Sequence, residues 1–562
     1  MGPCQVCLLR CGNLRNVLSS RVRPGQHVCQ RFMASTSTPE ADLPVIRVPR
    51  AMQQKVQDLQ QRKKPLRWRG RIFTARPGKE IITSKRKEFT HYLNQSYDKF
   101  SPPKLASQGW KHSKARGDYF TIVAYKGNPS LAGKGQNEGE DVESFQSLKL
   151  DSSLLDGLKD MGIDTPTGIQ VSALPVIKQG RNSLCAAETG SGKTLAYLLP
   201  LMHRLLVESR LTGASVTTGL PRGVVLVPVA ELAAQVWHEA HVLGKSAGLT
   251  VQFLDAGKSL KVMRNRLSSP TDIVISTPGP ILSALRQEIL GLRHVSHVVV
   301  DEADTMLDDS FVEQTLRILK KVNVGAGSPR KVTPPGEAQL TLVGATMPSD
   351  ATNILSEIVS QENLAIVSTP YLHQIMPHVQ QKFLRLHSED KAVKILELLK
   401  KEKKTVPTMI FCNTSLTCNW LAHFLKENGI ETLRLHSRMG DKSRSGVMSA
   451  FKAGKVDILV CTDIGSRGVD TVKVQHVINF DFPNFMSDYI HRAGRVGRVG
   501  SQGVGHVTNF VVHKWDVDLV NKIERAVRTR EGLPRFNTNI KRAHFNRAMQ
   551  EEMQALQGTM GG

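Results

Sequence analysis

A glycine-rich octapeptide holds the groups in this chain that are best suited to bind a phosphate. It consists of Ala187, Glu188, Thr189, Gly190, Ser191, Gly192, Lys193 and Thr194. Small residues let successive backbone N–H groups turn towards a phosphate, the Lys193 ammonium can neutralise outer phosphate oxygens, and the Thr194 hydroxyl can bind Mg²⁺. We therefore expect a nucleoside triphosphate here. A glycine-rich turn without a ligand is the alternative.

A second candidate group is the acidic tetrapeptide Asp-Glu-Ala-Asp at residues 301–304, directly after an apolar run. A carboxylate at a strand end opposite a phosphate loop can bind the Mg²⁺ on a β/γ-phosphate, and a neighbouring carboxylate can orient and deprotonate water. We assign Asp301 to the metal and Glu302 to the general base. The alternative is a cluster of acidic residues that only stabilises a helix N-terminus.

Parallel strands are the elements that must position both groups, because their carboxyl ends meet at one edge of a sheet. The strand–loop–helix context of the octapeptide is predicted by an apolar run at 182–186 and by helical spacing at 195–206. Buried strands are predicted at 223–227, 272–276, 297–300, 340–343, 408–412, 432–435, 457–461, 476–480 and 506–511, with a helix at 416–426. Two similar α/β domains in tandem, joined near residues 369–376, explain this order.

Composition favours a globular protein that binds a polyanion. The 562 residues are 40% apolar and carry a formal charge of +25. This length suits two or three domains, and the charge favours nucleic acid ahead of an anionic membrane surface. No apolar run reaches the length of a membrane span. The cysteines are scattered, which fits a reducing compartment better than a disulfide framework.

The N-terminal region divides into two basic parts. Residues 1–39 contain arginines but no Asp or Glu, which is typical of a mitochondrial transit peptide, and a disordered basic tail is the alternative. Residues 62–87 are rich in Lys and Arg, with Trp68 and Phe73 among them. Such a run can clamp phosphates and stack on unpaired bases, although a solvated linker fits equally well.

Three further motifs give the chain a family resemblance. They are Gly-Ile-Asp-Thr-Pro-Thr-Gly-Ile-Gln at 162–170, Cys-Thr-Asp-Ile-Gly-Ser-Arg-Gly-Val-Asp at 461–470, and His-Arg-Ala-Gly-Arg-Val-Gly-Arg at 491–498. Together with the tetrapeptide at 301–304, they resemble the DEAD-box RNA helicases of superfamily 2. The resemblance runs from about Phe145 to Phe510. The transit-like start and the basic extension are most similar to the vertebrate mitochondrial member of that family.

The resemblance implies roles for particular residues at the nucleotide. Gln170 would bind the adenine edge, Phe145 would stack on the ring, and Asp470 would contact the ribose, which together imply ATP. Arg495 and Arg498 would act as arginine fingers. A guanidinium from a second domain neutralises charge on a transferring phosphoryl group only when the domains close, so hydrolysis would depend on closure.

The resemblance also implies an RNA face across both domains. The residues expected there are Pro228, Glu231, Gly257, Thr277, Gly279, Arg444 and Thr462. Contacts to backbone and 2′-OH groups would make such binding largely independent of base sequence and sensitive to salt. ATP and RNA would each favour the closed state and would therefore cooperate.

The chain departs from the family pattern at several positions, including Ala256, where a glycine is usual. Val229 and Ala230 replace a threonine and an arginine, Pro280 replaces an arginine, and Gly344 replaces a serine. Two cationic phosphate contacts and one hydroxyl are thereby lost. Because the ATPase residues are all present, we expect hydrolysis to survive while RNA grip and unwinding are weakened.

These observations lead to a complete set of expectations. The fold is α/β with two tandem RecA-like domains, divided into a transit peptide at 1–39, a basic extension at 40–137, an ATP-binding domain at 138–368, a helicase C-terminal domain at 376–530 and a basic tail at 531–562. The protein would be a monomeric, ATP- and Mg²⁺-dependent RNA helicase of the mitochondrial matrix, acting on structured mitochondrial or ribosomal RNA with ribosome-assembly proteins. An RNA clamp or scaffold with little unwinding is the second hypothesis, and a DNA helicase is a poorer third.

Overall fold

The computed structural model describes residues 51–52, 54, 78–97, 102–131, 144–213, 217–255, 260–308, 311–326, 334, 336–346, 354–401, 406–463, 471–501 and 503–533. The chain divides into two units, Met1–Ala75 and Arg76–Gly562. Most of the first unit lies outside the described residues, including the expected transit peptide, and the basic run at 62–87 is described only from residue 78. Everything below concerns the second unit.

A seven-stranded parallel sheet forms the first lobe, with strand order β10-β4-β9-β8-β5-β7-β6. The strands are β4 (Asn182–Ala186), β5 (Gly223–Leu226), β6 (Val251–Leu254), β7 (Ile273–Ser276), β8 (His297–Val300), β9 (Gln339–Gly344) and β10 (Leu364–Ser368). The helices are α2 (Ser152–Asp160), α3 (Gly168–Lys178), α4 (Lys193–Thr212), α5 (Ala230–Ala247), α6 (Leu260–Leu267), α7 (Pro278–Arg286), α8 (Ala303–Met306) and α9 (Val312–Val322).

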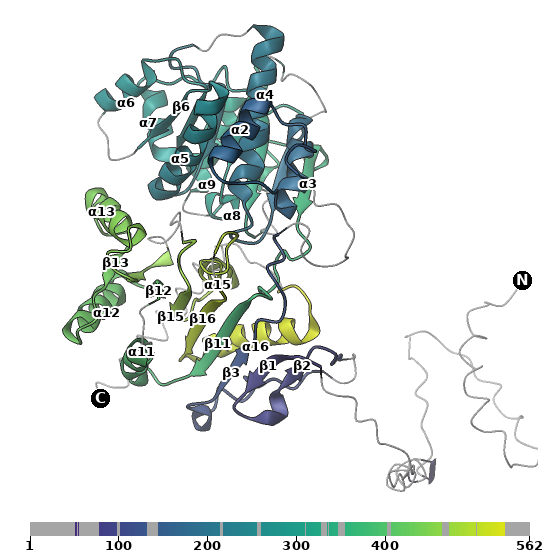
Figure 1. The fold of residues 1–562 in the computed structure, drawn as a ribbon, viewed down its shortest axis with the longest axis vertical. Coiled ribbons are helices and arrows are strands. Elements are labelled where there is room, and N and C mark those ends of the chain that lie inside the picture. Colours follow the sequence, from purple (N-terminus) through teal and green to yellow (C-terminus); the bar gives the residue numbers. More distant parts are fainter. Residues whose placement is uncertain are drawn as a thin grey trace, which may run out of the picture. The chain divides into compact units, whose positions relative to one another are not determined.

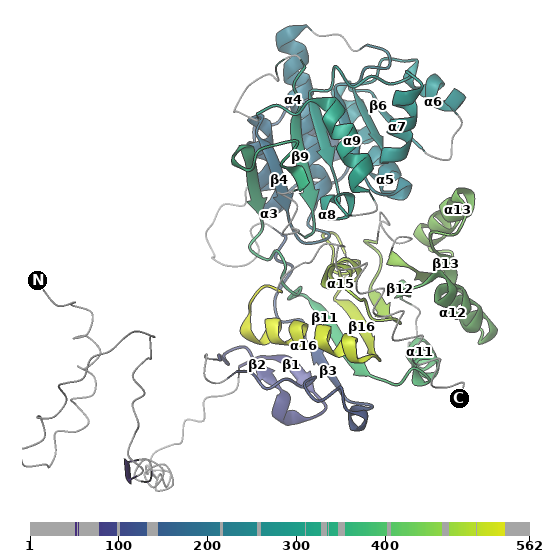
Figure 2. The same cartoon turned by 180° about the vertical axis from the view of Figure 1, so that it is seen from behind.

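Helices cover both faces of this sheet (Figures 1 and 2). Val299 joins the core shared with α2, α3, α4 and α5, whereas Val298 and Val300 join the core shared with α7, α8 and α9. Successive side chains in a strand point to opposite faces, so a strand buried on both sides is mostly apolar along its length. This explains why the strands appear in the sequence as continuous apolar runs.

The second lobe is built on a nine-stranded sheet with the order β13-β14-β12-β15-β16-β11-β3-β1-β2. Its parallel part consists of β11 (Val379–Arg385), β12 (Thr408–Phe411), β13 (Leu433–Leu435), β14 (Ile458–Cys461), β15 (His476–Asn479) and β16 (Gly505–Val511). The helices are α11 (Asp390–Lys401), α12 (Ser415–Glu427), α13 (Asp441–Lys452), α15 (Met486–Ala493) and α16 (Lys514–Thr529). The expected two-domain α/β fold is confirmed, and each strand predicted in the two domains lies within one residue of its observed bounds.

The remaining three strands of the second sheet come from the N-terminal extension. They are β1 (Glu80–Ser84), β2 (His91–Tyr92) and β3 (Tyr119–Ile122), and β3 pairs antiparallel with β11. Figure 1 shows these purple strands beside the green β11. The sequence predicts only a basic extension for this region, and none of the predicted strands lies there. The extension instead covers an edge of the second sheet that would otherwise expose unpaired backbone groups.

Aromatic packing joins the extension to the second lobe. Phe120 of β3 is fully buried and stacks on Phe383 of β11, with 4.7 Å between ring centroids. Trp110, also fully buried, lies 5.5 Å from Phe120, and Phe383 in turn contacts Tyr489 of α15. These rings lie in one continuous hydrophobic core. The extension is therefore part of the lobe, and the apolar residues that anchor it are too few to form a core alone.

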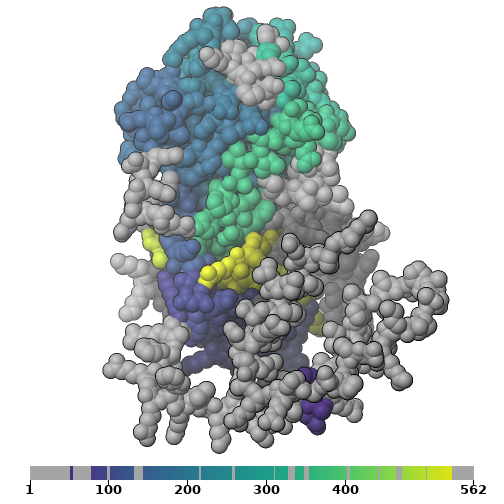
Figure 3. Space-filling model, turned by 90° about the vertical axis from the view of Figure 1, so that its right-hand side faces the viewer, coloured from purple at the N-terminus to yellow at the C-terminus, as the bar shows by residue number. Residues whose placement is uncertain are grey.

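A buried carboxylate fixes the extension to the last helix as well. Glu524 of α16 is fully buried and accepts hydrogen bonds from the backbone N–H groups of Ala106 and Ser107, at 2.8 and 3.0 Å. Its charge is balanced by Arg528, at 2.7 Å, which also donates to the carbonyl of Phe89. Figure 3 shows the purple extension directly against the yellow α16. Arg528 is thus a buried part of this contact.

No helix in the described part of the chain is both long and apolar enough to cross a lipid bilayer.

We expect Phe120→Ala to reduce the free energy of unfolding by about 3–5 kcal/mol, because it removes a ring from a closed core. Tyr119→Ala in the same strand is the matched control, since Tyr119 is 38% exposed, and its expected cost is below about 1 kcal/mol. Urea denaturation measures the loss, and amide hydrogen exchange in β11 and β16 assigns it to the second lobe. Equal small losses for the two variants would contradict an integral role for the extension.

Candidate active site

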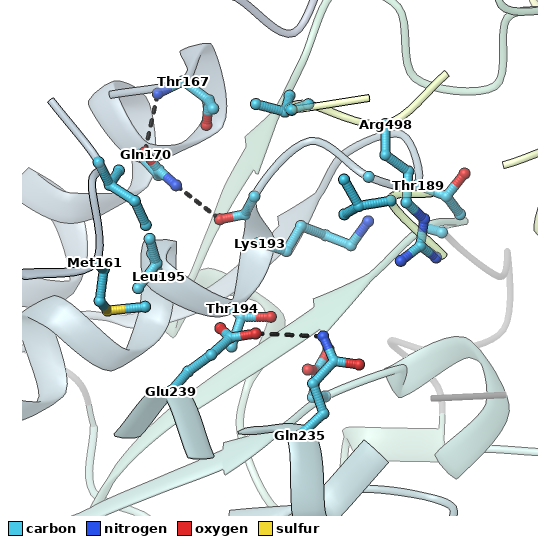
Figure 4. A pocket seen from close by; sticks show the side chains of 18 of the residues that line it. Met161, Thr167, Gln170, Thr189, Lys193, Thr194, Leu195, Gln235, Glu239 and Arg498 are labelled. Atoms are coloured by element: carbon cyan, nitrogen blue, oxygen red, sulfur yellow. Dashed lines mark hydrogen bonds between the residues drawn. The ribbon is translucent and has the colours of Figure 1, made fainter. Parts of the chain in front are cut away.

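A cavity of about 680 Å³ lies where loops of the two lobes meet. The first lobe contributes the loop between β4 and α4, the turn after β8, and the segment around residues 161–170. The second lobe contributes the end of α15 and the loop that follows it. Figure 4 shows the lining side chains. The expected phosphate loop, acidic pair and arginine motif therefore reach one place.

The phosphate loop needs glycine for two separate reasons. Gly190 and Gly192 have φ angles of +77° and +85°, in a region where side chains are disfavoured. A Cβ atom at Gly190 would lie 2.5 Å from Arg498 Cγ, and one at Gly192 would lie 2.7 Å from Gln170 Nε2. The loop thus combines backbone groups turned towards the cavity with close approach of neighbouring segments, an arrangement that suits a triphosphate.

Lys193 lies at the start of α4 with its ammonium inside the loop. The Nζ atom donates to the carbonyls of Ala187 and Glu188 at 2.9 and 2.8 Å. Burial lowers the pKa of Lys193, while Asp301 acts to raise it. The cation is therefore already desolvated, which strengthens its attraction to an anion in the cavity.

The acidic pair lies at the carboxyl end of β8, and its two members have different surroundings. Asp301 accepts hydrogen bonds from Tyr197 Oη at 2.9 Å and from the backbone N–H of Glu302 at 2.8 Å. Burial, and then the neighbouring Glu302 charge, raise the pKa of Asp301 to about 6. A cation in the cavity would offset both effects, so the site suits Mg²⁺ held by Asp301 and Thr194.

Glu302 has the features of a group kept available for chemistry. Its φ angle is +47°, a strained value for a residue with a side chain, in the sharp turn between β8 and α8. Its Oε2 atom is buried and has no hydrogen-bond partner among the described residues. Both Glu302 and Asp301 line the cavity. An unpaired carboxylate oxygen there can accept a proton from a bound water.

Asp304, the last residue of the tetrapeptide, joins the two lobes. It accepts hydrogen bonds from the backbone N–H and the hydroxyl of Thr346 at 2.9 and 2.8 Å, and it lies 3.3 Å from His491 Nε2 of α15. Burial acts to raise the pKa of Asp304, but His491 and the Thr346 bonds hold it well below its usual range. The contacts of Asp304 with Thr346 and His491 form although Gly344 lacks the hydroxyl that the family pattern places at this position.

The second lobe brings two arginines to the phosphate loop. Arg495 and Arg498 both line the cavity, and the Val499 N–H donates to the carbonyl of Gly190 at 3.1 Å. Gly494 packs so closely that a Cβ atom there would lie 1.4 Å from Thr189 Oγ1. In Figure 4, Arg498 and Lys193 occupy the same part of the cavity. The arrangement can neutralise a triphosphate from both lobes.

The expected adenine residues lie in different environments. Gln170 lines the cavity, accepts from the Thr167 N–H at 2.9 Å and donates to the carbonyl of Gly192 at 3.0 Å (Figure 4). It thereby ties α3 to the phosphate loop. Phe145 is only 4% exposed, lies in the hydrophobic core of the first lobe, and is not among the residues that line the cavity. The structure does not bring Phe145 together with the other nucleotide residues.

The expected RNA residues lie at strand ends and helix starts in both lobes. In the first lobe, Pro228 follows β5, while Thr277 and Gly279 lie at the start of α7. In the second, Thr462 follows β14 and Arg444 lies in α13.

An ion pair connects the two halves of this face. Arg444 of the second lobe contacts the Glu231 carboxylate of the first at 2.7 and 2.8 Å. Pro280, where the family pattern has a cation, is buried. Gly257 and Asp470 lie outside the described residues.

Sequence reasoning missed several residues of the site. Tyr197 orients Asp301, His491 pairs with Asp304, and Ser130 and Thr369 both donate to the Glu188 carboxylate. Tyr197 could have been found, because it lies four residues after Lys193 and hence on the same face of a helix. Ser130 and Thr369 lie far from Glu188 in the sequence, so no local pattern predicts their contacts with it.

Comparisons of sequence agree with this geometry. The sequence profile of the DEAD/DEAH box helicases matches residues 167–354, and the profile of the helicase conserved C-terminal domain matches residues 390–500. The chain is 40% identical to probable ATP-dependent RNA helicase DDX28 of Homo sapiens, over 90% of this chain and 94% of that protein. It is 30% identical to ATP-dependent RNA helicase vasa of Drosophila melanogaster, over 70% of this chain and 57% of that protein.

Solved structures show the same fold. Dbp5 of S. cerevisiae, bound to RNA and ADP BeF3, superposes with a TM-score of 0.56 at 26% identity, covering 69% of this chain and 94% of that chain. Mss116p bound to ssRNA and AMP-PNP superposes with a TM-score of 0.60 at 22% identity, covering 71% and 80%. With both domain profiles matched and a 40% identical relative covered almost in full, the chain belongs to the DEAD-box ATP-dependent RNA helicases.

Proposed function

We propose that the protein couples ATP hydrolysis to the clamping and local opening of RNA duplexes. The observation that supports this most directly is the split cavity, in which the phosphate loop and Glu302 of one lobe face Arg495 and Arg498 of the other. The expected RNA residues lie on the same two lobes and are joined by the Arg444–Glu231 ion pair. Closing the lobes would therefore complete the ATP site and the RNA face together.

Each residue at the nucleotide has a distinct role in this proposal. The phosphate-loop residues Ala187 to Thr194, with Gln170, bind and orient ATP. Glu302 accepts a proton from the attacking water, and Arg495 and Arg498 neutralise charge that develops on the γ-phosphate, a contribution of about 10³–10⁵ in rate. Mg²⁺, held by Thr194 and Asp301, would supply charge neutralisation on the β- and γ-phosphates. Phe145 would contact the adenine only after moving out of the core, and Asp470 is assigned by family pattern alone.

RNA and ATP cooperate in this scheme because each binds the closed arrangement more strongly than the open one. Neither ligand shifts the lobes unless its affinity differs between the two states. By linkage, the factor by which ATP raises RNA affinity equals the factor by which RNA raises ATP affinity. Hydrolysis removes the γ-phosphate contacts of Arg495 and Arg498 and so releases the clamp.

The cycle predicts different RNA release from three variants in excess ATP. Glu302→Gln keeps the size of the side chain but not its basicity, so ATP and RNA should bind while hydrolysis stalls and RNA release becomes slow. Lys193→Ala should release RNA rapidly because ATP binding is lost. Arg498→Ala should bind ATP without closing tightly, and should also release rapidly. Dissociation of a labelled RNA measures all three. Equal release rates would show that ATP does not control an RNA clamp.

An ATP-locked clamp or assembly scaffold with little unwinding is a second candidate function. Val229, Ala230, Pro280 and Gly344 stand where the family pattern has groups that hold RNA or connect it to the ATP site. Weaker contacts to the RNA backbone would reduce strand separation more than they reduce ATP turnover.

A short RNA duplex separates the two functions. If the protein opens duplexes, RNA-stimulated ATP turnover and strand displacement should both be lost in Glu302→Gln. If it is a clamp, the native protein should show RNA-stimulated turnover and slow RNA release without strand displacement. A duplex of the same sequence made with deoxyribose is the control, because an RNA helicase should discriminate against it.

We further propose that the protein works as a monomer in the mitochondrial matrix, on structured mitochondrial or ribosomal RNA. The acid-free, arginine-containing residues 1–39 support import. A single chain supplies both lobes of the cavity, so the site does not require a second copy. Ribosomal RNA is the abundant structured RNA of that compartment, which makes a role beside ribosome-assembly proteins the working hypothesis.

Deletion of residues 1–39 should leave a fluorescent fusion protein outside mitochondria, because the basic, acid-free segment would be the import signal. The measurement is the overlap of the fusion with a matrix marker. Fusion of residues 1–39 alone to the fluorescent protein is the control and should be imported. Unchanged mitochondrial signal after the deletion would show that the signal lies elsewhere.

A further inference from the structure

A short connector leads from the extension to the nucleotide cavity. Residues 125–131, here named the strap, follow β3 of the second lobe and end on the first lobe. The backbone N–H groups of Tyr125 and Lys126 donate to the carbonyl of Pro377, at 2.9 and 3.3 Å. At the other end, the carbonyl of Ser130 accepts from the Gly168 N–H at 3.3 Å, and Leu131 pairs with Thr167. The strap is thus a second covalent connection between the lobes, besides residues 369–376.

The strap reaches the phosphate loop through a buried carboxylate. Ser130 Oγ donates to Glu188 Oε1 at 2.7 Å, and Thr369 Oγ1, from the other connection, donates to Glu188 Oε2 at 2.5 Å. Glu188 is only 8% exposed. Its carbonyl also accepts from Lys193 Nζ at 2.8 Å and Ser191 Oγ at 2.7 Å. A displacement of Glu188 is therefore a displacement of the phosphate loop.

The strap also reaches the arginine loop. Asn128 Nδ2 donates to the carbonyl of Gly497 at 3.1 Å, and His378 Nε2 lies 2.7 Å from the same oxygen. Gly497 precedes Arg498 and has a φ angle of +67°. Asn128 Oδ1 accepts the Ser130 N–H at 3.0 Å, so the contacts to the two loops are tied to each other.

The two connections form a paired hinge. The strap follows β3, residues 369–376 precede β11, and these two strands are hydrogen-bonded neighbours in one sheet. Each connection also donates one hydrogen bond to the Glu188 carboxylate, from Ser130 in the strap and from Thr369 in the other connection. A rotation of the lobes must therefore either break the Ser130 contact to the first lobe or pull Asn128 away from Gly497.

We propose that Ser130 and Asn128 are positioning residues that latch the closed state, holding the phosphate loop and the arginine loop together through the strap. The proposal rests on the function proposed above. The latch acts on closure and not on chemistry, since neither residue lines the cavity. Through this latch the folded extension would contribute to ATP binding indirectly, because β3 anchors the strap that contacts the phosphate loop.

The measurable consequence is the coupling between nucleotide and RNA. Among the described residues, loss of the Ser130 hydroxyl leaves Glu188 Oε1 unpaired, with only the Thr369 bond to Oε2 remaining, and loss of Asn128 removes a donor from the Gly497 carbonyl. Each loss costs enough to shift the closing equilibrium by about tenfold. Ser130→Ala and Asn128→Ala should each lower the AMP-PNP-induced gain in RNA affinity by about that factor, and should raise the KM for ATP. RNA affinity without nucleotide should stay unchanged. The double variant should lose less than the product of the single effects, because both residues act through one strap.

The experiment measures binding of a labelled single-stranded RNA to the full chain by anisotropy, with and without AMP-PNP. Ser130→Thr keeps the hydroxyl and should restore coupling. Ser268→Ala is the matched control, since Ser268 is exposed and its hydroxyl donates, within the described part of the chain, to the nearby carbonyl of Asn265. Hydrogen exchange in β3 and β11 should be unchanged in every strap variant.

The outcomes separate the latch from the function on which it rests. Native coupling in Ser130→Ala, with coupling lost in Lys193→Ala, would overturn the latch and leave the proposed function standing. If Ser130→Ala lost RNA affinity equally with and without nucleotide, or if it sped up hydrogen exchange in β3, Ser130 would have only a structural role. Either result would also overturn the latch. Absence of coupling in the native protein would overturn the proposed function, and the latch with it.

Discussion

Repulsion between cations is the constraint on which the closed arrangement depends. Lys193 of one lobe and Arg495 and Arg498 of the other line a single cavity. Burial already disfavours the charged form of Lys193, and Arg498 disfavours it further. Asp301 offsets part of this charge. A triphosphate supplies the remaining negative charge, so its binding favours closure, and its cleavage weakens that preference.

The contacts between the lobes fit a structure that must close and reopen. Arg444–Glu231 and His491–Asp304 are small polar contacts, and neither brings a large apolar surface together. Arg444 is also an expected RNA residue, so a phosphate would compete with Glu231 for the same guanidinium. A hydrophobic interface would hold the lobes closed whatever the ligand, whereas these polar contacts leave the balance to ATP and RNA.

The parts of the fold visible in the sequence are those with a local signal. The run at 297–300 identified β8 because a strand buried on both faces is mostly apolar, and the phosphate loop was visible because Gly190, Gly192 and Lys193 lie within four positions of each other. β11 was missed because Gln381 and Lys382 interrupt its apolar pattern. Its partner β3 was missed because it lies within the long basic extension, apart from the alternating strands and helices of the two domains. The hydrogen bonds of Ser130 and Thr369 to Glu188 could not be predicted from the sequence for a different reason. The two residues lie 58 and 181 positions from Glu188.

The burial of Glu524 sets an order for the folding of the chain. Its hydrogen bond to Ala106 spans 418 residues, and the whole first lobe lies between the two. At about 5–20 residues per second, a ribosome needs roughly 20–80 s to make that interval. During this time β1, β2 and β3 lack their contact with α16, and for the larger part of it they also lack the neighbouring strand β11. A chain that enters a compartment N-terminus first presents its segments in the same order, so the extension arrives before the strand and the helix that complete its packing.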